Sequence, residues 1–175
     1  MTPYTAAYLS PLGPITLASD GEAVTGLWFV GQKYYPSHLD DECQNDSLGV
    51  FTQTKQWLDI YFSGRAPDFM PPLRAAGTAF QKEVWAILSA IPYGKTRTYG
   101  DIAGELAQKR GLPHMSAQAV GAAVGRNPIS ILIPCHRVVG QTGSLTGYAG
   151  GMDKKQALLR LEGALKAEYF IPRRG

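Results

Sequence analysis

The stretch ILIPCHRVVG, residues 131–140, places Cys135 directly before His136 in a chain that has only two cysteines. A thiol attacks as its thiolate, and a neighbouring imidazole is a common base for generating that anion. Glu162, in the leucine-rich stretch LLRLEG, could hold the second nitrogen of His136. Consecutive residues of a strand point to opposite faces, so the pair can cooperate only if the chain turns there or a water bridges them, and Pro134 favours a turn. These residues predict nucleophilic chemistry at a cysteine.

Simpler interpretations stay open for the same residues. Free cysteines are commonly buried and inert, and Glu162 could lie on a solvated helix face. A disulfide between Cys43 and Cys135 is disfavoured, because the N-terminal stretch MTPYTAAYLSPLG has no export signal. His38 and Cys43 supply too few ligands at useful spacing, so we expect no metal site.

Composition limits the classes of protein that remain. The 175 residues suffice for one medium domain or two small ones, and 45% are hydrophobic, which excludes a disordered chain. No apolar run reaches the roughly 18 residues that span a bilayer, so we expect a cytoplasmic protein without membrane contact.

The net charge of +3 is unevenly distributed. Residues 1–77 carry 4 Lys and Arg against 8 Asp and Glu, whereas residues 78–175 carry 13 against 6. A basic second half indicates contact with a polyanion. A solvated basic surface would have the same composition.

The first half is expected to contain a meander of strands followed by a helix. Turn signals SPLG and SDGE separate strand-like segments at residues 4–10, 14–19 and 24–31. The apolar spacing predicts a helix from about Leu48 to Phe62. The segment RAPDFMPPLRAAGT, residues 65–78, is the expected linker because it holds three prolines and coincides with the charge switch.

The second half is expected to be mostly helical. Thr78 and Gln81 form a capping box at the start of one helix, and Asp153 with Gln156 is expected to open the last. Between them the pattern predicts helices at 98–110 and 116–127, a short buried strand at 129–134 and a hairpin or wing at 140–148. This order is typical of a winged helix-turn-helix.

The expected helix SAQAVGAAVGRN carries almost no side-chain bulk. A bare helix can approach a minor groove about 6 Å wide, whereas a major-groove reader needs long polar side chains. Close packing against other helices of the domain would explain the small residues equally well. Two sides of one helix could do both.

Three stretches together resemble a known family: NPISILIPCHRVV at 127–139, TGYAGG at 146–151 and LLRLEG at 158–163. They are similar to the O6-alkylguanine-DNA alkyltransferases, also called methylated-DNA–protein-cysteine methyltransferases. Upstream, IPYGKTRTYGDIA also fits, whereas residues 1–77 fit only by length and strand order. The resemblance implies an α+β fold. A small N-terminal ribonuclease-H-like α/β domain with the linker (1–77) would precede a winged helix-turn-helix DNA-binding domain (78–175) that carries the active site.

The resemblance also implies a role for each site residue. Cys135 would accept the alkyl group, His136 would act as a base through a water, and Glu162 would orient His136. Asn127 would brace the active-site turn, and Tyr99 would hydrogen-bond the flipped base and crowd its 3′ phosphate. Contacts to the guanine are implied for Tyr148, the backbone N–H of Ala149, and the carbonyls of Cys135 and Val138.

The implied partner is double-stranded DNA, bound through its minor groove with the alkylated base flipped out. The family usually has an arginine early in the third helix of the DNA-binding domain. In this chain that helix is expected at 116–127, and it has Gln118 followed by Ala119 at this place. Glutamine lacks the charge and the planar stacking group, so we expect weaker binding or slower flipping. Arg126, Arg137 and Lys95 are candidates for phosphate contacts. We expect a monomer, and cooperative binding along DNA stays open.

Three functions fit these observations. The first is irreversible transfer of an alkyl group from O6-alkylguanine, and by resemblance from O4-alkylthymine, to Cys135. It needs no cofactor, and the thioether product has no good leaving group, so each molecule would act once. The second is a non-catalytic sensor of alkylated DNA, although alkyltransferase-like sensors replace the acceptor cysteine. The third is a hydrolase with Cys135, His136 and Glu162 as its triad, which would not need a basic DNA-binding half.

Overall fold

The computed structural model describes residues 4–36 and 44–172. The chain divides into two compact units, one of Met1–Ala76 with Pro128–Leu132 and one of Gly77–Asn127 with Ile133–Gly175. Segment 128–132 departs from the expected boundary, which assigned every residue after 77 to the second domain. His38 and Cys43, considered above for a metal or a disulfide, lie outside the described residues. None of the helices in the described ranges combines the length and apolar character that crossing a bilayer requires.

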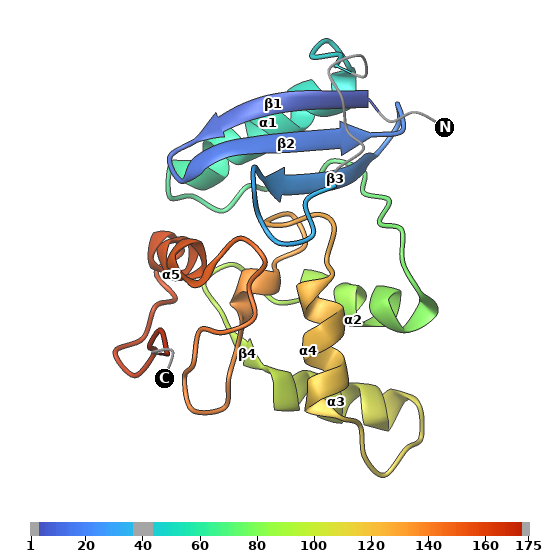
Figure 1. Cartoon of the computed structure of the whole chain (residues 1–175), viewed down its shortest axis with the longest axis vertical. Coiled ribbons are helices and arrows are strands. Elements are labelled where there is room, and N and C mark those ends of the chain that lie inside the picture. Colours follow the sequence, from blue (N-terminus) through green and yellow to red (C-terminus); the bar gives the residue numbers. More distant parts are fainter. Residues whose placement is uncertain (1–3, 37–43, 173–175) are drawn as a thin grey trace. The chain divides into compact units, whose positions relative to one another are not determined.

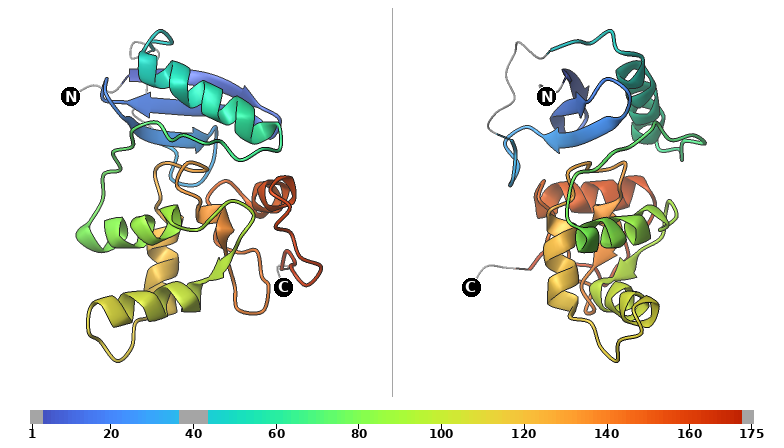
Figure 2. Two further views of the ribbon diagram at one scale, coloured as in Figure 1. Left: turned by 180° about the vertical axis from the view of Figure 1, so that it is seen from behind. Right: turned by 90° about the vertical axis from the view of Figure 1, so that its right-hand side faces the viewer.

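The first unit is an antiparallel sheet with one helix on it. Strands β1 (Tyr4–Ser10), β2 (Gly13–Ser19) and β3 (Val24–Phe29) lie in the order β1-β2-β3 (Figure 1). Helix α1 (Gly49–Phe62) covers one face of this sheet (Figure 2). Ile15 and Leu17 of β2 are buried with the less buried Thr16 between them, as the period of two in a strand requires, whereas Ala18 and Ser19 are both buried. The core includes Ile15, Leu17, Leu27, Phe51, Leu58 and Tyr61.

Segment 128–132 continues the sheet at the edge of β3. The backbone N–H of Leu27 donates to the carbonyl of Pro128 at 2.9 Å, and the N–H of Ser130 donates to the carbonyl of Leu27 at 3.1 Å. Only Ile129 forms a β-bridge, and the chain turns at Ile131, whose φ of 71° is left-handed. The strand expected at 129–134 is therefore wrong, because a β-branched residue in that conformation ends an extended run.

The second unit begins with the helices of the expected helix-turn-helix: α2 (Ala79–Ser89), α3 (Tyr99–Lys109) and α4 (Ala117–Gly125). The capping box expected at Thr78 and Gln81 is confirmed. Helix α4 buries Val120, Ala123 and Val124, and the indole N–H of Trp85 on α2 donates to the carbonyl of Ala123 at 2.9 Å. One side of α4 therefore packs closely inside the unit, and its other side is exposed.

The remaining elements carry the candidate site. A two-residue strand β4 (Arg97–Thr98) pairs in parallel with β5 (Val138–Val139), which directly follows the 3₁₀ turn η2 (Cys135–Arg137). Helix α5 (Met152–Leu161) has Gly151 as its N-cap, without a side-chain capping bond. Asp153 therefore lies in the first turn and does not open the helix as expected.

The expected hairpin at 140–148 closes through the N–H of Gly140, which donates to the carbonyl of Ser144 at 2.8 Å. The C-terminal segment then pairs with it, since the N–H of Leu145 donates to the carbonyl of Phe170 at 2.9 Å. An apolar cluster under this hairpin fixes it on α5; its buried members are Val139, Leu145, Leu159 and Ala164.

Candidate active site and nucleic-acid interface

The turn that the sequence favours at Pro134 is present. Pro134 has φ −81° and ψ 66°, and Cys135 then opens one turn of 3₁₀ helix. Successive residues of such a helix lie a third of a turn apart, so Cys135 and His136 do not point to opposite faces as they would in a strand. Both side chains are buried: Cys135 is 6% exposed and His136 is inaccessible.

Asn127 and Ile133 flank segment 128–132, and a hydrogen bond joins them. The side-chain amide of Asn127 donates to the carbonyl of Ile133 at 2.8 Å, closing the chain just before the nucleophile turn. The same side chain hydrogen-bonds Cys135. Asn127 therefore links the shape of the turn to the sulfur, in the bracing position that the resemblance implies.

Glu162 is the centre of a buried polar cluster. Its Oε2 lies 2.6 Å from Nε2 of His136, and its Oε1 accepts from the backbone N–H of Gly94 at 3.0 Å and from Nε of Arg137 at 2.9 Å. Burial alone raises the pKa of Glu162, but the hydrogen bonds and electrostatic interactions with His136 and Arg137 lower it to about 2. The alternative of a solvated helix face is wrong for this residue, which lies at the C-terminal end of α5.

His136 is a neutral imidazole in these surroundings. Burial lowers its pKa, the hydrogen bond and charge of Glu162 raise it, and the charges of Arg137 and Lys155 lower it further, with a net decrease. Since the Glu162 carboxylate can only accept, Nε2 of His136 carries the hydrogen of their bond. A proton taken up by this ring therefore goes to Nδ1.

The pKa of the Cys135 thiol is raised, chiefly by burial. Hydrogen bonds from Asn127 and from the backbone N–H groups of Cys135 and His136, together with the charge of Lys155, oppose this rise without cancelling it. Without substrate, Cys135 is therefore a thiol. The site holds this thiol beside a neutral base, with groups in place that favour the anion once it forms.

Lys155 is a functional candidate that the sequence reasoning missed. Its side chain is inaccessible, its ammonium donates to the carbonyl of Thr146 at 2.9 Å, and burial lowers its pKa to about 8. A signal was available, because positions 155, 158, 159 and 162 share one face of a helix. Burying a lysine and a glutamate beside two leucines costs free energy of desolvation, so both charged residues are expected to have a role there.

Tyr99, the first residue of α3, lies near the sulfur, whose charge contributes to its raised pKa after the larger effect of burial. Its hydroxyl donates to the carbonyl of Thr146 at 3.0 Å. The phenol thus stays neutral and acts as a hydrogen-bond donor. Contact with a flipped base, the implied role, requires it to exchange Thr146 for the base.

The residues with implied guanine contacts lie near His136 and Cys135 in this unit. Tyr148 is buried, with its ring edge-on to His136 at 6.4 Å between centroids, and Ala149 is half-buried. Val138 is buried in β5, and its N–H donates to the carbonyl of Cys135. Their contacts with a base stay predictions.

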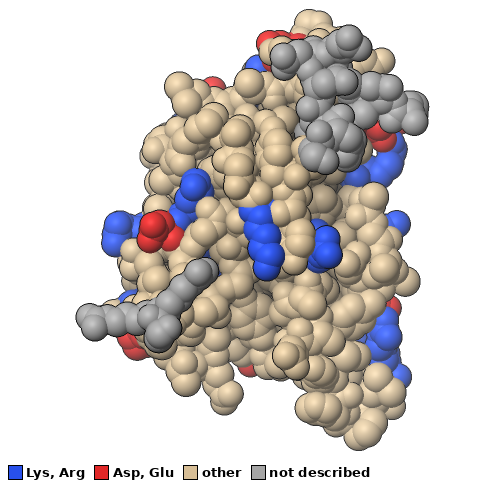
Figure 3. Space-filling view, in the orientation of Figure 1, with Lys and Arg blue, Asp and Glu red and all other residues tan. Residues whose placement is uncertain are grey.

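The predicted DNA-contacting residues divide into two groups. Gln118 and Ala119 lie exposed on the bare side of α4, and Arg126 and Lys95 are also exposed. Arg137 is buried, and its Nη1 donates to the carbonyl of Ile91 at 2.6 Å, so its predicted phosphate contact is wrong. On the face drawn in Figure 3, basic side chains occur as separate groups within largely uncharged surface.

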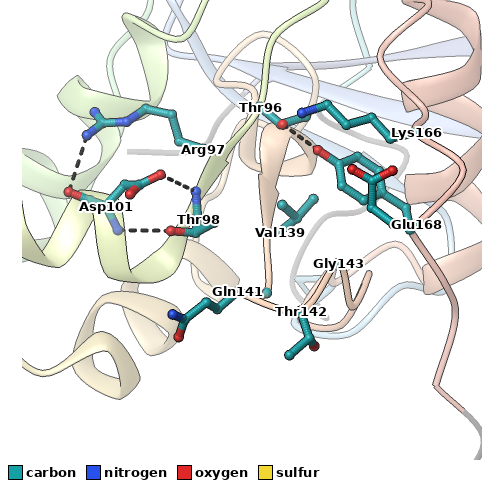
Figure 4. Close-up of a pocket in the computed structure, with 12 residues that line it drawn as sticks. Thr96, Arg97, Thr98, Asp101, Val139, Gln141, Thr142, Gly143, Lys166 and Glu168 are labelled. Carbon is teal, nitrogen blue, oxygen red and sulfur yellow. Dashed lines mark hydrogen bonds between the residues drawn. The ribbon is translucent and has the colours of Figure 1, made fainter.

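A polar cavity of about 290 Å³ opens elsewhere in the second unit (Figure 4). Its walls come from β4 and the start of α3, from the hairpin, and from the C-terminal segment; they include Thr96, Arg97, Asp101, Gln141, Lys166 and Glu168. None of the predicted catalytic side chains lines it.

The two halves of the chain match two parts of one family. Residues 4–75 match the ribonuclease-like domain of 6-O-methylguanine DNA methyltransferase, and residues 79–164 match its DNA-binding domain. These matches confirm the expected α+β fold, in which a ribonuclease-like sheet domain precedes a helical DNA-binding domain.

Individual relatives agree over most of the chain. The methylated-DNA–protein-cysteine methyltransferase of Mycobacterium leprae is 46% identical over 153 residues, covering 87% of this chain and 88% of that protein. The protein of the same name from Methanosarcina acetivorans is 44% identical over 161 residues, covering 92% and 99%. The crystal structure of Mycobacterium tuberculosis OGT in complex with DNA is similar, with a TM-score of 0.78 and 42% identity over 92% of this chain and 93% of that one. This chain therefore belongs to the 6-O-methylguanine DNA methyltransferase family.

Proposed function

We propose that this protein repairs DNA by direct reversal of alkylation, transferring the alkyl group of O6-alkylguanine to Sγ of its own Cys135. O4-alkylthymine is proposed as a second substrate. The observation that carries the proposal is a buried thiol in one 3₁₀ turn with His136, whose Nε2 is held 2.6 Å from Glu162. Membership of the family, and the DNA complex of the Mycobacterium tuberculosis relative, support DNA as the partner.

The reaction needs one proton to move and one bond to be exchanged. The thiol proton of Cys135 passes through a water to Nδ1 of His136, and the sulfur then attacks the alkyl carbon in line with its bond to O6. The C–O6 bond breaks with its electron pair on the guanine. Tyr99 hydrogen-bonds the purine or gives it a proton. The imidazolium then releases the proton taken from Cys135, to the purine in the first case and to Tyr99 in the second, so that guanine leaves neutral.

The electrostatics of the site suit this order of events. Burial keeps Cys135 protonated until substrate arrives, which protects it from adventitious electrophiles. While His136 holds the proton, Lys155 and the N–H groups of the turn stabilise the sulfur anion. The product is a thioether, which has no good leaving group at the sulfur. One turnover per molecule follows.

Access for the base needs a local opening. Cys135 is 6% exposed, and a nucleobase within a stacked duplex cannot reach it. We propose that DNA binds through the exposed side of α4, that the alkylated nucleotide flips out of the minor-groove side, and that Tyr99 exchanges Thr146 for the base. Flipping costs a few kcal/mol, which backbone contacts along the duplex must offset. We also propose that the protein acts in the cytoplasm, with the nucleoid if the host is a prokaryote.

Intact-protein mass after incubation with duplex DNA containing one O6-methylguanine tests the proposal. We expect each chain to gain one CH₂ and then stop, and peptide mapping to place it on Cys135. The chain has one other cysteine, so Cys43→Ser is the matched control. We expect this variant to react fully. The Cys135→Ser variant must not react.

The same measurement separates the alternatives. A sensor would bind the methylated duplex without gaining mass. A hydrolase would release product from an ester or amide over many cycles while its own mass stays unchanged. Either result, or methylation of Cys43, would overturn the proposal.

A further inference from the structure

Arg137 is the least expected member of the buried cluster. Its side chain is 8% exposed, and its guanidinium makes contacts on three sides. Nε and Nη2 donate to the two oxygens of Glu162 at 2.9 and 3.2 Å, and Nη1 donates to the carbonyl of Ile91 at 2.6 Å. The ring of Tyr93 lies 5.8 Å from the guanidinium carbon. Because these bonds and its burial hold the guanidinium inside the protein, Arg137 is not placed to reach a phosphate, and its role lies within the cluster.

The contacts of Arg137 fix both oxygens of Glu162. Oε1 accepts from Arg137 and from the backbone of Gly94, and Oε2 accepts from Arg137 and His136. With every acceptor position occupied and the guanidinium planar, the carboxylate cannot rotate without breaking several bonds. The position of the imidazole therefore depends on Arg137 through Glu162.

The Glu162–Arg137 ion pair is neutral without any charge on the histidine. Glu162 carries one negative charge and Arg137 one positive charge, and they are in contact. Without Arg137, Glu162 would be a buried anion whose nearest partner is His136, and an imidazolium would form to neutralise it. Such a ring already carries its proton and cannot take one from Cys135.

We propose that Arg137 is a positioning residue that neutralises Glu162, keeps His136 in its proton-accepting form, and so sets the lowest pH at which Cys135 reacts. This inference rests on the proposed function and deepens it. The other ionisable groups around His136 are Cys135 on η2, Lys155 and Glu162 from α5, and Tyr148 from the loop before α5. Of these, Lys155 acts on His136 in the same direction as Arg137, and Glu162 acts in the opposite direction.

The test is the pH dependence of single-turnover methyl transfer, with methylated duplex in saturating excess and the reaction followed by intact-protein mass. In Arg137→Met the acid midpoint of the rate should move upward by about one pH unit or more, the usual effect of removing an adjacent charge. Arg137→Lys keeps the charge, so its midpoint should stay near that of the wild type even if its rate falls. Arg160→Met, at an exposed arginine of α5, should not move the midpoint.

A second variant covers the case in which Arg137→Met does not fold, because that variant leaves a buried carboxylate unpaired. The double variant Arg137→Met, Glu162→Gln removes both charges, and its midpoint should lie at or below that of the wild type. A structural role alone would slow both variants without moving either midpoint. That result in proteins that do become methylated overturns the role of Arg137, whereas a wild type that gains no CH₂ overturns the proposed function instead.

Discussion

Lys155 and Tyr99 donate hydrogen bonds to the same backbone oxygen, the carbonyl of Thr146, at 2.9 and 3.0 Å. The ammonium of Lys155 also lies 5.7 Å from the centre of the Tyr99 ring. One carbonyl therefore places a buried cation and a phenol side by side, and the Cys135 thiolate, once it forms, interacts electrostatically with both groups. The cation can stabilise the sulfur anion, and the phenol can serve the departing purine.

Replacing Lys155 with methionine should slow methyl transfer about 10- to 100-fold at neutral pH, since its charge lowers the pKa of the Cys135 thiol. The pKa of Lys155 is about 8, so in the wild type this assistance is lost as the pH rises past that value. We expect an alkaline decline in the wild-type rate that the variant lacks. Single-turnover rates from neutral to alkaline pH measure both effects, with Lys154→Met as the control. An alkaline limb unchanged in Lys155→Met would contradict the assignment.

Gly147 is required by the position of the Tyr99 hydroxyl. A Cβ at residue 147 would lie 2.6 Å from that oxygen, and the φ of 88° is one that side-chain-bearing residues rarely adopt. Gly147→Ala should therefore lose about 1–3 kcal/mol of stability and slow the reaction by displacing Tyr99. Chemical unfolding and single-turnover kinetics measure the two losses.

The matched control is Gly104→Ala, inside α3, where an added Cβ meets no atom within 4 Å. This variant should gain about 0.5–1 kcal/mol, because alanine is the better helix former. If Gly147→Ala also proved stabilising with an unchanged rate, the close approach to Tyr99 would not matter.

The parts of the fold that local rules determine were predictable from the sequence. The strands at 4–10 and 24–31 were recognised to within two residues because alternation and turn signals are local. The cap of α2 follows from Thr78 and Gln81, which are three residues apart. The strand at 129–134 failed for the opposite reason. Its β-branched residues favour extension, but Ile131 takes a left-handed conformation that only the surrounding tertiary structure imposes.

The candidate site was predictable where a motif marks it and unpredictable where burial decides. Cys135, His136 and Glu162 were named from sequence, and the structure brings the last two into contact. The role of Arg137 was misassigned because exposed and buried arginines look alike in sequence. Lys155 was not predicted because a lysine in a helix is ordinarily exposed, although its spacing to Glu162 places both on one helix face.

Gln118 allows a direct test of what the exposed side of α4 contributes. Gln118→Arg adds a positive charge and a planar stacking group at the exposed position where the family usually has an arginine. We expect tighter binding to methylated duplex, a steeper salt dependence by about one charge, and faster methyl transfer at sub-saturating DNA. Binding isotherms at several salt concentrations measure the first two. Ala122→Arg, one turn further along the same exposed side, is the control. It adds the same charge at a different position, so it separates the effect of charge from that of an arginine at residue 118. Equal repair by the wild type and Gln118→Arg would show that glutamine already suffices.

Glu162 should dominate the acid sensitivity of the second unit. Its pKa of about 2 lies below the ordinary 4.5, so its contribution to stability is complete above pH 4.5 and is lost as the pH falls towards 2. At neutral pH, Glu162→Gln leaves the Arg137 charge buried without its anion and should cost about 3–5 kcal/mol. That difference from the wild type should shrink steadily on acidification through this window, which denaturant unfolding at a series of pH values measures. Glu105→Gln is the matched control, since the pKa of Glu105 is also lowered by hydrogen bonds from Arg97 and Lys109 at the surface. Its cost should stay within about 1 kcal/mol, because exposed ion pairs contribute little. A Glu162→Gln deficit as small as that, or one that did not change with pH, would mean that the buried cluster does not hold the carboxylate in its ionised form.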